Sequence, residues 1–275
     1  MSECCYRILF MQSISRKLHH TIYHYGWEIR NRNLASANVL RSVLAELPEQ
    51  PKLTLLDVGC GTLGLAEFLP GVGAVGMDLE PPPEFIPDFT FVLGNITALP
   101  FPDRSFPVVS CVDVLEHLPL EIREQAISEL VRVAAHAVII GCPHGEVAQK
   151  CDEQYRDDCE ARNRPLPSWL VEHLRQPYPA EDEILDQIKK AAAATGSTVK
   201  TSVLYSEPVS ISRLSRAAAA RSNALFVTVN LFFGVLSKIV PAPDARNSYR
   251  MIVLAELEGQ GELPEQREAL SEAAK

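Results

Sequence analysis

The sequence lacks the features that mark several large classes of protein. Positive charge is not in excess, because 26 Lys and Arg stand against 35 Asp and Glu and give a formal net charge of −9. Proteins that bind DNA or RNA neutralise phosphates with a basic face, so this balance argues against a nucleic-acid partner. Residues 1–20 lack the long apolar core of a secretory signal peptide. We therefore expect a cytoplasmic protein.

Long hydrophobic runs are also missing. The longest apolar stretch, residues 224–240, is interrupted by Asn230 and Lys238. A membrane-spanning helix needs about 20 predominantly apolar residues. We expect a buried or lid-forming helix here, with contact to a membrane or a lipid-like substrate as the less favoured alternative.

The cysteines follow no disulfide or zinc pattern. Their number is odd, at seven, and their spacing is irregular. An extracellular disulfide framework has paired cysteines at regular spacing, so free thiols in a reducing compartment are predicted. No Cys/His set has the spacing of a zinc site.

What the chain does contain is an alternation of short apolar runs with helical patterns. Strands are predicted at residues 53–58, 72–78, 89–94, 108–112, 137–140, 198–205 and 249–257. Helical spacing of apolar residues fills 121–135 and 182–196. This alternation predicts an α/β fold with a doubly wound, mostly parallel sheet.

The same pattern divides the chain into parts. Residues 1–50 read as helices that cap the site, 51–257 as the main domain, and 258–275 as a flexible acidic tail. Two insertions, 143–181 and 206–247, interrupt the sheet pattern. Ligands of open parallel sheets bind beyond the carboxyl ends of the strands, and the first insertion leaves from that edge. The second does so too if the last strand is antiparallel, so both are expected to form helical lids.

A glycine-rich turn follows the first predicted strand. DVGCGTLG, residues 57–64, has the spacing Gly-x-Gly-x-x-Gly, and Asp78 closes the next strand about twenty residues later. Such a turn brings backbone N–H groups close to a ligand, and a carboxylate at the second strand can accept two ribose hydroxyls. By itself the pattern fits NAD and S-adenosylmethionine equally well.

The stretch GNITALPFPDRSFPVVSCVDVLEHLP, residues 94–119, separates the two cofactors. Together with DVGCGT and GMD it resembles the class I S-adenosylmethionine-dependent methyltransferases that act on small molecules. The matching positions are Gly94, Leu99-Pro100-Phe101, Asp103, Ser105-Phe106 and Leu115-Glu116-His117. The resemblance covers about residues 53–140. It implies a Rossmann-like sheet of seven strands, the last one antiparallel, and S-adenosylmethionine as the cofactor.

The resemblance also implies which residues hold the methionine part of that cofactor. Gly59 and Gly61 would let it lie against the turn, and Asp57 would shape the loop and reach the amino group indirectly. Asp113 or its neighbours would lie near the same amino group.

For the adenosine part, Asp78 would bind the ribose hydroxyls and Leu79 would flank the adenine. Asn95 and Ile96 would meet the adenine edge. Asn95 stands where the family usually has aspartate, but it keeps an acceptor oxygen for an adenine amino group.

Two further departures concern backbone geometry. Leu63 replaces the third glycine of the family turn, with Gly64 next to it to relieve crowding. Pro107 replaces an aspartate before the fourth strand and puts the start of that strand in doubt, because proline cannot donate to a ladder.

Catalytic residues are harder to name. His144, after the fifth strand, and His117 are weak candidates for a general base, and Trp169 for a substrate contact. Asp113, Glu116 and His117 resemble the metal-binding arrangement of some family members and would suit a hard cation. We favour the reading in which Leu-Glu-His only shapes the start of the site and no metal is bound.

The sequence therefore predicts a methyltransferase that acts on an O, N or C atom of a small molecule, with an apolar molecule as one option. Two alternatives are an NAD-dependent oxidoreductase and a non-catalytic binding protein with the same fold. Neither the methyl acceptor nor the oligomeric state is predicted.

Overall fold

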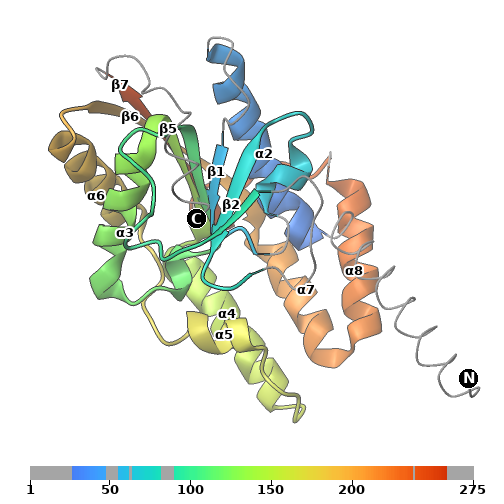
Figure 1. Cartoon of the computed structure of the whole chain (residues 1–275). Helices are drawn as coiled ribbons and strands as arrows, with labels where there is room; N and C mark the ends of the chain where they lie inside the picture. Colours follow the sequence, from blue (N-terminus) through green and yellow to red (C-terminus); the bar gives the residue numbers. More distant parts are fainter. Residues whose placement is uncertain (1–26, 48–54, 62–63, 82–89, 238, 259–275) are drawn as a thin grey trace, which may run out of the picture.

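A computed structural model describes residues 27–47, 55–61, 64–81, 90–237 and 239–258. Its centre is one seven-stranded sheet with the strand order β3-β2-β1-β4-β5-β7-β6 (Figure 1). The strands are β1 (Leu55–Val58), β2 (Ala74–Asp78), β3 (Thr90–Leu93), β4 (Phe106–Val112), β5 (Ala134–Pro143), β6 (Thr198–Pro208) and β7 (Ser248–Glu258). The α/β class and the seven strands predicted from the sequence are confirmed.

Strand direction decides where the insertions emerge. Strands β1 to β5 pair in parallel, whereas β7 runs antiparallel to both β5 and β6. The register Pro143↔Arg250 places the beginning of β7 at the carboxyl end of β5. The segments after β5 and after β6 therefore both leave from the carboxyl edge of the sheet, where ligands of this architecture bind.

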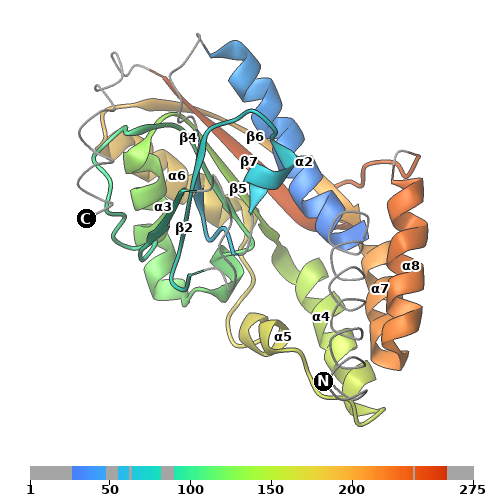
Figure 2. The ribbon, with the colours of Figure 1, turned by 45° about the vertical axis from the view of Figure 1, so that its right-hand side comes forward.

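Helices cover both faces of the sheet. The chain forms α2 (Trp27–Glu46), η1 (Leu65–Phe68), η2 (Leu115–His117), α3 (Leu120–Val133), α4 (Gly145–Glu160), α5 (Ser168–His173), α6 (Glu181–Ala194), α7 (Val209–Arg221) and α8 (Asn223–Leu236). Helices α3 and α6 lie on one face and α2 on the other (Figure 2). Leu56 belongs to the apolar core under α3 and α6, and its neighbour Leu55 to the core under α2. This explains why β1 is apolar throughout instead of alternating.

Pro107 does not prevent the fourth strand from starting before Val108. Strand β4 begins at Phe106, and its pairing with β5 shifts register between Phe106 and Val108. Because a bulge tolerates a residue that cannot donate a hydrogen bond, the proline sits where the ladder is already irregular.

The helices of the two insertions pack against each other at the lower edge of the sheet in Figure 2. Tyr155 and Cys159 of α4, Leu170 of α5 and Ala220 of α7 share one buried apolar cluster. On α8, Asn230 and Gly234 are buried, whereas Phe232 and Val235 are exposed. Among the described helices, none is both long and apolar enough to cross a membrane. The lid function predicted for these insertions stays a prediction.

Candidate active site at the carboxyl edge of the sheet

Asp57 shapes the turn after β1 from inside. Its carboxylate is buried and accepts hydrogen bonds from the Leu65 N–H at 2.7 Å and the Ser110 hydroxyl at 2.7 Å. Burial raises the pKa of Asp57 to about 6, although both hydrogen bonds favour the charged form. Gly64 is required beside it, because a Cβ there would lie 2.0 Å from Asp57 Oδ2 and the backbone has φ +55°. Thr62 and Leu63 lie outside the described residues.

The two glycines of the turn differ in what surrounds them. A Cβ on Gly59 would lie 2.2 Å from Cγ2 of Val114, so this glycine allows the turn to pack on the segment after β4. Gly61 has φ +56°, and a Cβ there would meet nothing within 4 Å. Gly61 therefore borders open space on the ligand edge of the sheet.

Asp78 ends β2 beside that space. Its Oδ2 accepts a hydrogen bond from the Gly61 N–H at 2.9 Å, and its Oδ1 accepts one from the Leu79 N–H at 2.7 Å. An ionised carboxylate offers about four acceptor positions, so two remain for ligand hydroxyls. Leu79 follows with 64% of its surface exposed, an apolar side chain left at the rim of the same edge. Together with Gly61, this arrangement fits the ribose and adenine of S-adenosylmethionine.

The segment after β3 is held by its own hydrogen bonds. Asn95 Oδ1 accepts from the Thr97 N–H and hydroxyl, both at 3.0 Å, and the side chain is exposed. Ile96 is 6% exposed and packs in the main core. Both acceptor positions of the Asn95 amide oxygen are therefore filled by Thr97, and only its amide N–H groups remain for a ligand. Most of the Ile96 side chain serves packing.

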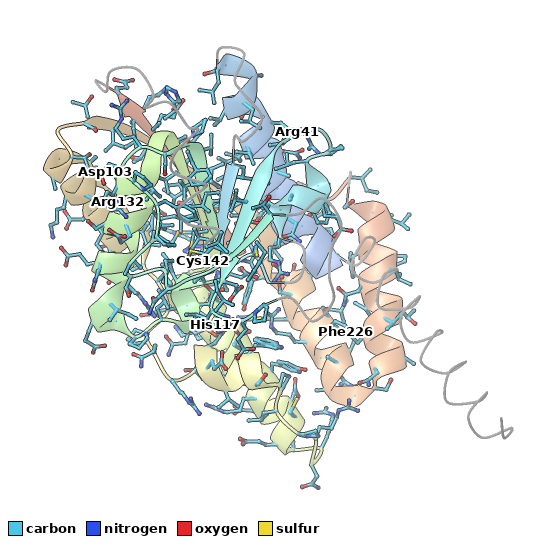
Figure 3. The ribbon with its side chains drawn as sticks, in the orientation of Figure 1. Arg41, Asp103, His117, Arg132, Cys142 and Phe226 are labelled. Carbon is cyan, nitrogen blue, oxygen red and sulfur yellow. The ribbon has the colours of Figure 1, made fainter. Side chains whose placement is uncertain are left out.

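A pair of side chains on α3 explains the Leu-Pro-Phe stretch that follows. Arg132 donates to the backbone carbonyls of Leu99 and Phe101 and to Asp103 Oδ1, and Glu129 accepts from the Leu99 N–H. Asp103 and Arg132 are seen together beside α3 in Figure 3. Arg132 and Glu129 thus fix this stretch to the C-terminal end of α3.

Asp113, at the carboxyl end of β4, has cationic partners of its own. Its carboxylate accepts hydrogen bonds from Arg32 of α2 and Arg250 of β7. The residue has φ +57°, and its N–H donates to the Gly141 carbonyl at 2.8 Å. Asp113 lies at the predicted edge, but two arginines neutralise its carboxylate, and it does not join Glu116 and His117 in a ligand set.

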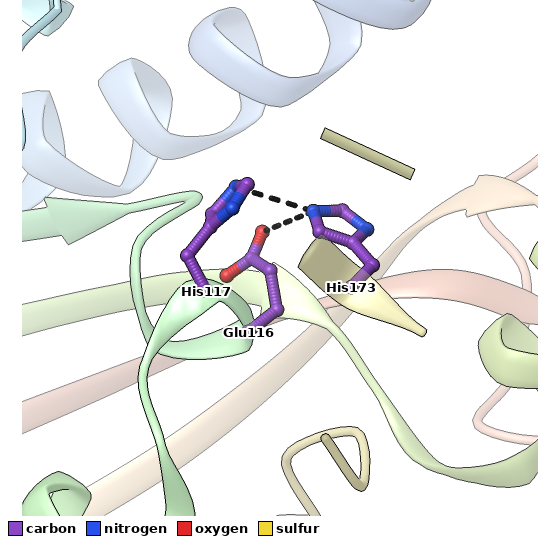
Figure 4. Close-up of side chains that lie close together, drawn as sticks. All are labelled: Glu116, His117 and His173. Atoms are coloured by element: carbon purple, nitrogen blue, oxygen red, sulfur yellow. Dashed lines mark hydrogen bonds and ion pairs between the residues drawn. The ribbon is translucent and has the colours of Figure 1, made fainter. Parts of the chain in front are cut away.

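Instead, His173 of α5 joins them (Figure 4). We call Glu116, His117 and His173 the Glu-His-His cluster. Each residue offers one possible ligand atom, and these three atoms lie within 4.8 Å of one another. The two Nε2 atoms are 3.2 Å apart, and His173 Nε2 lies 3.9 Å from Glu116 Oε1. Burial raises the pKa of Glu116 to about 8, and burial and the facing His173 lower the pKa of His117.

A buried carboxylate, that of Asp152, contacts His173 on the side away from the rest of the cluster. The Asp152 carboxylate, on α4, accepts hydrogen bonds from three groups: Arg216 Nε at 2.7 Å, the Tyr178 hydroxyl at 2.5 Å and the Tyr249 hydroxyl at 2.8 Å. One of its oxygens, Oδ2, also lies 3.3 Å from His173 Nδ1. Burial disfavours the charge of Asp152, but Arg216 and the hydrogen bonds outweigh it and keep the pKa below its usual value.

The two remaining predicted residues are partly engaged in packing. His144 is 8% exposed and lies against the ring of Tyr205, with 5.7 Å between ring centroids. Burial lowers the pKa of His144. Trp169 stacks on Tyr155 and meets the edge of His173 at 5.1 Å, which links the predicted substrate contact to the Glu-His-His cluster.

Sequence reasoning missed His173, Asp152 and Glu172. One signal was present, because Glu-His-Leu occurs twice, at 116–118 and 172–174. The two copies meet crosswise: His117 Nδ1 bonds Glu172 Oε2 at 2.8 Å, and His173 approaches Glu116. Asp152 gives no comparable signal, because nothing in its neighbourhood in the sequence indicates burial with an arginine 64 positions away.

Comparison with known proteins finds similar sequences and a similar fold. Residues 56–141 match the family model of a methyltransferase domain. The chain is 30% identical over 128 residues to an uncharacterized methyltransferase of Schizosaccharomyces pombe, covering 38% of this chain and 45% of the relative. It is 31% identical over 160 residues to 2-methyl-6-phytyl-1,4-hydroquinone methyltransferase of Synechocystis, covering 53% of this chain and 43% of the relative. The chain thus spans less than half the length of these relatives.

Among solved structures, a SAM-dependent methyltransferase from Archaeoglobus fulgidus has a similar fold. The TM-score is 0.50 at 15% sequence identity, and the match covers 82% of this chain and 94% of that one. At this identity the likeness concerns the fold alone.

Proposed function

We propose that this chain is a class I S-adenosylmethionine-dependent methyltransferase that moves a methyl group from S-adenosylmethionine to an oxygen, nitrogen or carbon atom of a small apolar molecule. One observation supports the cofactor most directly. Gly61 borders open space beside Asp78, whose carboxylate is held in place by two backbone N–H groups and keeps acceptor positions free. Such an arrangement would suit a ribose and the chain attached to it.

The cofactor, when bound, supplies an already activated sulfonium methyl group. The chain then has to align the acceptor and exclude water, and no covalent intermediate on a side chain is needed. Asp78 would bind the ribose hydroxyls, Leu79 would cover one side of the adenine, and Asp57 would keep the turn in shape from below.

We propose that the acceptor binds next to η2. Val114, one residue before η2, packs on Gly59 of the cofactor turn, so the side chains that follow it reach the same edge. Helix α5 closes this place from the other side through His173 and Trp169. An apolar acceptor is supported by the Synechocystis relative, whose named substrate carries a phytyl chain.

Asp78→Ala is expected to weaken S-adenosylmethionine binding by about 1–3 kcal/mol, because the ribose hydroxyls lose their acceptor. Isothermal titration calorimetry with S-adenosylmethionine, its demethylated product and NAD measures this. Glu80→Ala, two residues further along the exposed rim, is the matched control and should bind normally. Equal affinities of Asp78→Ala and the parent chain would mean that the ribose lies elsewhere, and binding of NAD alone would contradict the proposed function.

The acceptor class is tested by a transfer screen. Formation of the demethylated cofactor is measured with prenylated quinols and other lipid-like molecules beside sugars of similar size. We expect turnover with the apolar set. Turnover restricted to sugars would leave methyl transfer intact but refute the apolar acceptor.

A further inference from the structure

Three buried or half-buried acceptor atoms converge at the Glu-His-His cluster. The side chain of Glu116 has no exposed surface, and neither of its carboxylate oxygens has a hydrogen-bond partner. Leaving a buried carboxylate oxygen unpaired is costly, and such groups are normally compensated by hydrogen bonds or by a metal ion. Glu116 points at His173 Nε2 (Figure 4), so whatever compensates it must also satisfy the imidazoles.

Carboxylates on the far side fix which ring nitrogens carry protons. His117 Nδ1 lies 2.8 Å from Glu172 Oε2, and His173 Nδ1 lies 3.3 Å from Asp152 Oδ2. An ionised carboxylate can only accept, so each Nδ1 donates. In the neutral rings, both Nε2 atoms then present lone pairs to each other across 3.2 Å. Carboxylates behind ligating histidines are the usual outer shell of a protein metal site.

A proton alone does not satisfy this geometry. One proton shared between the two Nε2 atoms pairs the imidazoles but leaves both Glu116 oxygens without a donor. A proton on Glu116 itself would lie too far from His173 Nε2 for a hydrogen bond, because the two heavy atoms are 3.9 Å apart. A cation bound to one atom of each residue satisfies all three. Tetrahedral ligands about 2.1 Å from a zinc ion lie roughly 3.4 Å apart. The separation of the two Nε2 atoms, 3.2 Å, and that of His173 Nε2 from Glu116 Oε1, 3.9 Å, lie on either side of that spacing.

We propose that Glu116, His117 and His173 bind one borderline divalent cation of the Zn²⁺ type. Two imidazoles and one carboxylate suit zinc and its first-row neighbours better than Mg²⁺ or Ca²⁺, which prefer oxygen ligands alone. Three protein ligands leave a coordination position open. The His117 side chain is 29% exposed, against 7% for His173, so the open position faces the His117 side.

The place of the cluster suggests what fills that position. The residue before η2, Val114, contacts the glycine turn, so the cation lies on the edge where we place the methyl acceptor. A donor atom of the acceptor can then complete the coordination. This second part rests on the proposed function, whereas cation binding itself does not.

The test uses the purified full chain, stripped with a chelator and titrated with Zn²⁺. We expect about one zinc per chain by elemental analysis, unaffected by excess Mg²⁺. With Co²⁺ as the probe, we expect visible absorption without the near-ultraviolet band of thiolate ligation, which separates this site from the free cysteines. Failure to bind stoichiometric Zn²⁺, or a thiolate band, would overturn the proposal.

Variants locate the site. Glu116→Gln keeps the shape of the side chain and should lower the Zn²⁺ affinity more than about 100-fold, because a ligand is lost. Glu172→Gln removes a positioning residue whose side chain is 50% exposed, so the fold should be unaffected, and the affinity should fall about 10- to 100-fold. Glu146→Gln, on an exposed surface pair with Lys150, and His136→Ala are the matched controls and should bind as the parent does.

The outcomes separate cation binding from methyl transfer. Unchanged zinc affinity in both Glu116→Gln and Glu172→Gln, or loss of zinc in a control, would show that the metal binds elsewhere. Zinc binding without any binding of S-adenosylmethionine would uphold the site and reject the proposed function.

Discussion

Asp152→Asn is expected to lower the free energy of unfolding by about 3–5 kcal/mol, the usual cost of removing one member of a buried ion pair. Asp152 and Arg216 are 0% and 8% exposed, and their contact is 2.7 Å long. The amide of asparagine keeps an acceptor oxygen but loses the charge that compensates the guanidinium. The hydroxyls of Tyr178 and Tyr249 also lose a charged acceptor, which weakens both hydrogen bonds.

Chemical denaturation of Asp152→Asn beside Asp186→Asn measures this effect. Asp186 pairs with Lys190 one turn along α6, and both side chains are 62% exposed. Such a surface pair contributes roughly 0.3–0.5 kcal/mol, so the control should unfold almost as the parent does. A similar small loss of unfolding free energy in both variants would show that Asp152 does not stabilise the packing of the helical insertions.

Gly61→Ala is expected to weaken S-adenosylmethionine binding about 100-fold or more, about 2.7 kcal/mol. The added methyl group would enter the open space that we assign to the cofactor, where the backbone must approach the ligand closely. The structure provides a matched control in Gly71, which also has positive φ and would also add its methyl group to open space. Gly71 lies in the turn after η1, outside the proposed site.

Both alanine variants should lose about 1–2 kcal/mol of stability, because each places a side chain in the left-handed region. Only Gly61→Ala should lose affinity in calorimetry. Parent-like affinity in both variants would place the cofactor away from this turn. An equal loss of affinity in both would mean that backbone strain, not contact, controls binding.

Much of the fold could be predicted because patterns of neighbouring residues indicate it. The apolar run ending at Val58, the glycine turn and Asp78 each reflect a requirement of a few neighbouring residues, and all lie where expected. Boundaries were less predictable. Strand β5 begins at Ala134 instead of residue 137, because it continues directly from α3 and its ends are buried by other elements instead of being marked by turn residues.

The candidate site was predictable only in part. Asp113 was expected to face a ligand, but it meets Arg32 and Arg250, which come from the two ends of the described chain. Neither arginine carries a local sign of this pairing. Glu116 and His117 were recognised from the Leu-Glu-His pattern, but the third member of their cluster comes from an insertion that the family pattern does not describe.

By itself, the sequence determined the architecture and the glycine turn, because alternating apolar runs, glycines in a turn and a carboxylate at the end of β2 are properties of short segments. Only the tertiary structure decided which charged side chains meet. Helix α5 brings His173 to within 3.2 Å of His117, 56 positions earlier, and Asp152 orients it from α4. Contacts over such separations depend on how the insertions pack, since burial and electrostatic compensation are settled by all the neighbours in space and not by the neighbours in the chain.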